Sequence, residues 1–61
     1  MTRDRAIERA KKMREGEARM RKIAQDWRMP FGERYKAVVM AEEYDEAARR
    51  FDRVAEMPHA K

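Results

Sequence analysis

The chain has 61 residues, 46% of them charged, and a formal net charge of +4, so it can form at most one small domain with a modest core. It contains no cysteine, which excludes disulfides and thiolate zinc sites as supports for so small a fold. Because a core of this size supplies only about 3–5 kcal/mol, we expect self-association or a permanent partner to add stability.

The composition favours long helices in a cytoplasmic protein. No apolar run approaches the ~18 residues that a membrane span needs, and no secretory signal core is evident. Alanine, glutamate, arginine, lysine and methionine are abundant, and all of them favour helices. This usage is typical of a coiled-coil protein rather than of a disordered tail.

The first helix is predicted over residues 2–28. Thr2 can cap its start, Asp4 lies in the first turn and Arg28 lies in the last turn, as the helix dipole favours. A seven-residue repeat runs through this segment. Its members are Ala6, Met13, Met20 and Trp27, with Arg9, Gly16 and Ile23 between them.

A turn is predicted over residues 29–32, followed by a second helix over 31–57. Pro30 disfavours helical geometry in the residue before it and can itself open a helix. Pro58 ends the second helix and leaves a short tail at 58–61. The second helix carries its own repeat, formed by Ala37, Tyr44 and Phe51, with Met40, Ala47 and Val54 between them.

Two apolar stripes joined by a short turn predict an all-α fold, an antiparallel two-helix hairpin packed like a coiled coil. The hairpin forms a single domain over 1–61, and we expect it to dimerise into a four-helix bundle. Folding about Pro30 sets Gly16 opposite Tyr44, which gives this mid-helix glycine a packing role. A column of small residues either allows close approach of the backbones, within the hairpin or to a second layer of helices, or reflects helix propensity alone; it comprises Ala10, Ala24, Ala41, Ala48 and Ala55.

A competing interpretation breaks the second helix near Glu43. Residues 43–54 begin Glu-Tyr-Asp-Glu-Ala and continue to Phe51, and a proline follows at Pro58. This pattern resembles the second half of a tetratricopeptide repeat, and it is also similar to the UVR motif of nucleotide-excision repair proteins. Either resemblance implies a short helical hairpin that docks between proteins. The turn glycine of the repeat family is absent, with Glu42 and Glu43 in its place.

The residue types argue against an enzyme and against a cofactor. The chain has no serine and no cysteine, and Thr2 is its only threonine, so side-chain nucleophiles are scarce. Its single histidine, His59, lies in the tail without a second histidine for a metal site. The acidic run at 42–46 lacks the spacing of a calcium loop, so it indicates a solvated helix face.

Apolar residues outside the two repeats gather near the hairpin tip, and such patches often mark interfaces. They predict a non-enzymatic protein–protein interaction module, which would act as an adaptor, inhibitor or accessory subunit. Alternatively, the cluster closes the tip or forms the core of a homodimer. The expected partner-binding residues are Trp27, Phe31, Tyr35, Val38 and Val39, with Arg21 and Arg28 as a polar rim.

The first helix also carries a basic face. Residues 1–28 hold ten lysines and arginines against five acidic residues, whereas residues 29–61 hold six against seven. Such a face suits a phosphate backbone, so the alternative function is backbone-directed RNA or DNA binding. Its contacts would be Lys12, Arg14, Arg19, Arg21 and Lys22.

Overall fold

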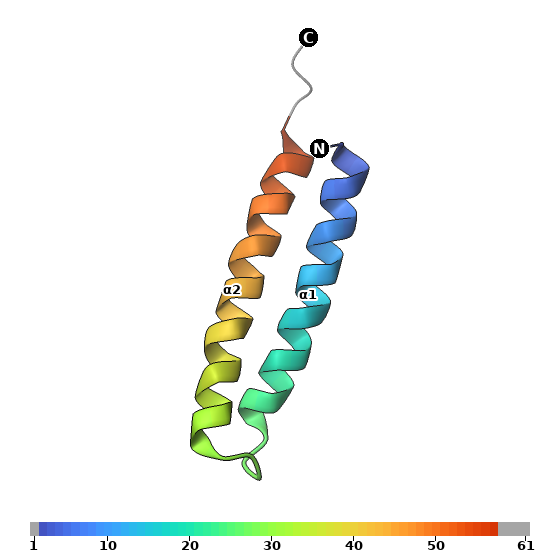
Figure 1. The fold of residues 1–61 in the computed structure, drawn as a ribbon. Coiled ribbons are helices and arrows are strands. Elements are labelled where there is room, and N and C mark those ends of the chain that lie inside the picture. Colours follow the sequence, from blue (N-terminus) through green and yellow to red (C-terminus); the bar gives the residue numbers. More distant parts are fainter. Residues whose placement is uncertain (1, 58–61) are drawn as a thin grey trace.

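The computed structural model describes residues 2–57 and shows two helices that lie side by side and run in opposite directions (Figure 1). Helix α1 spans Arg3–Gln25 and helix α2 spans Phe31–Glu56. No strand occurs within these residues. The prediction of an all-α helical hairpin is therefore confirmed, while the predicted tail at 58–61, with His59, lies outside the described residues.

Helix α1 begins as predicted but ends early. The Thr2 hydroxyl oxygen accepts a hydrogen bond from the backbone N–H of Arg5 at 3.2 Å. The helix stops at Gln25, three residues before the predicted end at Arg28, because Asp26 adopts an extended conformation. The Asp26 carboxylate accepts the backbone N–H of Arg28 at 3.0 Å, and the Asp26 carbonyl oxygen accepts the N–H of Met29 at 3.0 Å. A side chain that bonds the backbone two residues onward favours a turn over a helix.

Helix α2 begins at Phe31, directly after Pro30, and runs without interruption to Glu56. The turn therefore covers 26–30 rather than 29–32, and α2 stops one residue short of the predicted end at Met57. No break occurs near Glu43, so the interpretation as two shorter helices is wrong.

The contact line between the helices (the seam) is most deeply buried at its alanines, while larger residues such as Met13, Met20, Tyr44 and Phe51 are half-buried along it. Among residues 2–57, five alanines are buried to 5% exposure or less, and no large side chain is fully buried. Buried and half-buried residues follow the seam at 6, 10, 13, 17, 20 and 24 in α1 and at 34, 37, 41, 44, 48, 51 and 55 in α2; Gly16 is buried beside this line, and residues 23, 45, 47 and 52 are half-buried beside it. This spacing of three and four residues places the seam residues along one face of each helix.

The structure confirms most of the two predicted repeats and corrects the rest. Positions 6, 13, 16, 20, 37, 44 and 51 pack at or beside the seam as predicted, and Ile23 and Ala47 are half-buried next to it. Arg9, Trp27, Met40 and Val54 are exposed, so the prediction that they lie in the seam is wrong. Ala10 and Ala41 line the seam in place of Arg9 and Met40. Met40 and Val54 are instead 44% and 38% exposed. Alanine allows two helices to approach closely, and the column of small residues lies within the seam.

Gly16 and Tyr44 meet as predicted. A Cβ atom added to Gly16 would lie 2.8 Å from two ring carbons of Tyr44, which is closer than real contacts allow. The aromatic ring therefore occupies the space that the glycine leaves. Over the described residues, neither helix has an apolar stretch long enough to cross a membrane.

Candidate interaction surfaces

The aromatic side chains near the hairpin tip lie in solvent. Trp27, Phe31 and Tyr35 are 80%, 77% and 62% exposed. The rings of Phe31 and Tyr35 are one helical turn apart, with centroids 6.4 Å from each other. Val38 and Val39 follow on α2 at 40% and 38% exposure. We call Trp27, Phe31, Tyr35, Val38 and Val39 the tip cluster.

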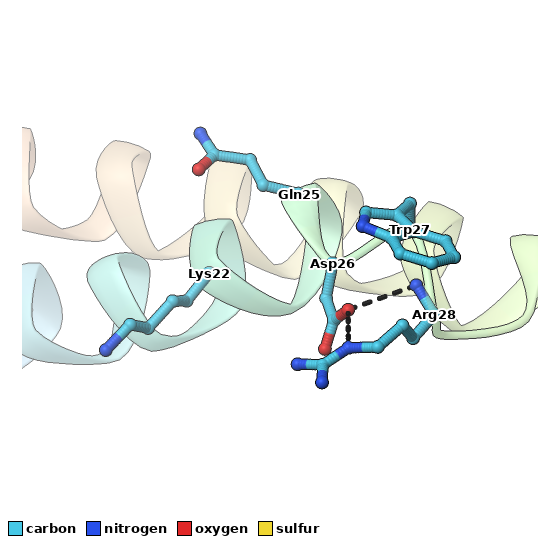
Figure 2. A pocket seen from close by; sticks show the side chains of 5 residues that line it. All are labelled: Lys22, Gln25, Asp26, Trp27 and Arg28. Carbon is cyan, nitrogen blue, oxygen red and sulfur yellow. Dashed lines mark hydrogen bonds and ion pairs between the residues drawn. The ribbon is translucent and has the colours of Figure 1, made fainter.

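Hydrogen bonds in and around the turn stabilise the backbone next to the tip cluster. The Asp26 carboxylate is directed at Arg28 and accepts both its backbone N–H and its side-chain Nε–H, at 3.0 and 3.1 Å (Figure 2). Arg34 adds a bond from α2, because its Nε donates to the carbonyl oxygen of Ala24 at 3.3 Å. An open groove of about 570 Å³ lies here, and its lining residues are Lys22, Gln25, Asp26, Trp27 and Arg28.

One side of the hairpin carries ion pairs, some between the two helices and some within one helix. Arg14 lies 2.5 Å from the carboxylate of Asp52 and 3.7 Å from that of Asp45. The hydrogen bond and the charge of Asp52 raise the pKa of the Arg14 guanidinium. Arg21 pairs with Glu17 at 2.7 Å, and Arg49 pairs with Asp45 at 3.2 Å. These contacts hold the cations against this protein's own carboxylates.

Helical spacing sorts the exposed residues into two sides of the seam. The side that contains the pairs of Arg14 and Arg21 follows positions 7, 11, 14, 18, 21 and 25 of α1 and 35, 38, 42, 45, 49, 52 and 56 of α2. We call it the ion-paired flank. The opposite side, the basic flank, follows positions 5, 9, 12, 16, 19 and 23 of α1 and 33, 36, 40, 43, 47, 50 and 54 of α2.

The five residues predicted to bind nucleic acid are divided between these sides. Arg14 and Arg21 lie on the ion-paired flank with carboxylate partners, whereas Lys12 and Arg19 lie on the basic flank. Lys22 is exposed on the outer surface of α1. Among residues 2–57, no ion pair involves Lys12, Arg19 or Lys22. The structure therefore does not bring the five together on one face.

The basic flank contains an apolar groove that the sequence analysis missed. The groove measures about 310 Å³ and is lined by Met13, Met40, Glu43, Tyr44 and Ala47. It was missed because the repeat assigned Met40 and Ala47 to the seam. The alanine column was the available signal, since a seam shifted onto Ala41 and Ala48 leaves Met40 exposed and Ala47 at its edge.

Within residues 2–57, no group of three histidine, cysteine, aspartate or glutamate side chains is placed to hold a metal ion. What the described chain offers is surface: an aromatic tip, an ion-paired flank, and a basic flank with an apolar groove. Comparison of the chain with protein-family models, with curated proteins and with solved structures finds no match.

Proposed function

We propose that this hairpin is a small, non-enzymatic protein–protein interaction module, an adaptor, inhibitor or accessory subunit that docks through the tip cluster. The observation that supports the proposal is the exposure of three aromatic side chains, Trp27, Phe31 and Tyr35, next to a seam already filled by alanine. These rings have no place in the hairpin's own core. Contact with a second molecule would bury them.

The energetics favour an interface at this end. Apolar surface contributes roughly 25 cal/mol per Å² when it is buried, and an aromatic side chain can bury about 150–250 Å². Tryptophan, tyrosine and arginine are also the residues that most often dominate binding energy. Arg28, fixed by Asp26, and Arg21, fixed by Glu17, would form the polar rim at little cost in conformational freedom.

A second copy of the chain is one partner that the tip cluster would accept. Two hairpins that joined through their tip clusters would form the four-helix bundle expected from the sequence. The chain would then be a homodimer, and the rings of both copies would share one apolar core.

The test is the double variant Tyr35→Asp with Val38→Asp. Both side chains are well exposed, so the charges leave α2 helical while they place two carboxylates in the contact. We expect association to be lost, measured by sedimentation equilibrium and by capture of partners from native lysate with and without nuclease. The control Ile7→Asp with Ala18→Asp adds the same charge to exposed positions of α1 away from the tip. An unchanged mass together with unchanged capture would refute the proposal.

The alternative function is backbone-directed binding of RNA or DNA. Its support is the exposure of Lys12, Arg19 and Lys22, none of which is engaged by a carboxylate among residues 2–57. Such binding would be strongest at low salt and indifferent to nucleic-acid sequence. Absence of any electrophoretic retardation at ~50 mM salt would exclude it.

A further inference from the structure

The net positive charge of the chain is concentrated on the basic flank. The basic flank contains six cations and only two carboxylates, Glu33 and Glu43. The cations are Arg5, Arg9, Lys12, Arg19, Lys36 and Arg50. The ion-paired flank is balanced, with four cations against four carboxylates. The surplus of the basic flank therefore equals the formal net charge of the whole chain, +4.

An apolar strip runs between these cations. Its centre is the groove of about 310 Å³ beside Met13, Met40 and Tyr44. Ile23 continues the strip on α1 toward the tip, and Val54, 38% exposed, continues it on α2 toward the other end. Methionine side chains are flexible and polarisable, so they adapt to the shape of an incoming side chain.

We propose that the basic flank binds an acidic amphipathic helix of a partner protein. The partner's apolar stripe would lie along the strip, and its carboxylates would face the cations of both helices. Arg9, Lys12 and Arg19 lie along the strip on α1, while Arg50 and Lys36, which pairs with Glu33 at 3.9 Å, lie along it on α2. A helix laid into the groove between two others completes a three-helix packing and reaches both rows at once.

The charge distribution favours an acidic amphipathic helix over two other occupants, a second copy of the chain and a nucleic acid. A symmetric contact between two copies would set the same patch against itself, so the four surplus charges of one copy would face those of the other. A nucleic acid would satisfy the cations but would leave the apolar strip without a partner. An acidic amphipathic helix satisfies both. This surface is separate from the tip cluster, because Tyr35 and Val38 follow the opposite flank.

The probe is a fluorescent synthetic peptide of about 20 residues, long enough to follow the groove for roughly 30 Å. Leucine occupies one face at helical spacing, and glutamate occupies the flanks. One control peptide replaces every glutamate by lysine, and a second keeps the acidic composition in scrambled order. Binding to the full chain is followed by fluorescence anisotropy at ~50 and ~300 mM salt, because screening weakens the ionic contribution. A single-stranded oligonucleotide of similar length serves as a further probe.

The acidic helix is expected to bind and both control peptides are expected to fail. Arg9→Glu with Arg19→Glu should weaken binding at least about tenfold, because two attractions become repulsions. The matched control Arg3→Glu with Lys11→Glu makes the same change of charge outside the flank and should leave binding within about twofold. Met40→Ser tests the apolar strip and should also weaken binding. Far-UV circular dichroism verifies that each variant is folded, and Lys12→Glu with Arg50→Glu serves as a second flank pair if the first loses helicity.

Several results would overturn the proposal. They are equal binding of the scrambled or lysine peptide, loss of binding in the matched control, no effect of either flank pair, tighter binding of the oligonucleotide, and no binding of the acidic helix. A dimer of the free chain that Met40→Ser dissociates would assign the strip to a second copy instead.

Discussion

Replacement of Gly16 by alanine has two opposing effects of similar size on the free energy of unfolding. A glycine-to-alanine change inside a helix ordinarily stabilises by about 1 kcal/mol. Here the new Cβ would lie 2.8 Å from the Tyr44 ring, so the ring must move outward into the neighbouring groove. Forcing extra volume into a packed site costs about 1–3 kcal/mol. We therefore expect Gly16→Ala to give no net stabilisation, and a loss of up to about 2 kcal/mol.

The measurement is urea denaturation followed by circular dichroism at 222 nm, on Gly16→Ala, Tyr44→Ala and the double variant. Once the ring is gone, Gly16→Ala should stabilise by close to 1 kcal/mol, as in an exposed helix. The coupling between the two positions should then be at least about 1 kcal/mol. Gly32→Ala is the matched control, because nothing lies within 4 Å of its added Cβ and its φ is not positive. If Gly16→Ala stabilised equally with and without Tyr44, the packing role of the glycine would be disproved.

Two further predictions concern the seam and the ion pairs. Ala48→Leu places a large side chain at a fully buried position and should destabilise the hairpin by about 1–3 kcal/mol. The control Ala18→Leu, on the exposed surface, should change stability little. Equal urea midpoints for the two variants would contradict the close approach of the helices at the seam. Arg14→Gln removes the ion pairs with Asp52 and Asp45, so it should lower the thermal midpoint at low salt. The effect should be smaller at ~1 M salt, because salt screens exposed charges. A difference from the parent chain that does not depend on salt would show that packing, not charge, explains the loss of stability.

The sequence was sufficient for the helices, their direction and one contact across the seam. The proline between two heptad repeats predicted the hairpin, and the unusual mid-helix Gly16 predicted its meeting with Tyr44. These features are local or depend on a single large complementarity in volume. The unbroken α2 also follows from local preference, since residues 42–46 include no helix breaker.

The shift of the seam could not be derived from hydrophobicity. Met40 and Val54 are more apolar than Ala41 and Ala48, so a ranking by apolar character places the larger residues inside. Packing reverses this order, because the free energy also depends on how closely the two backbones approach. The apolar groove beside Met40 was missed for the same reason, and the early end of α1 depended on where the Asp26 side chain points.

The alanine seam has a consequence for how the hairpin closes. The alanines along the seam are small and nearly equivalent, so they offer little to distinguish one alignment of the helices from another displaced by seven residues. Such a displacement would bring Tyr44 over Arg9 or Ile23, whose side chains fill the volume that is free at Gly16. A single aromatic ring above a single missing side chain thus selects one alignment among several that the alanines alone would tolerate.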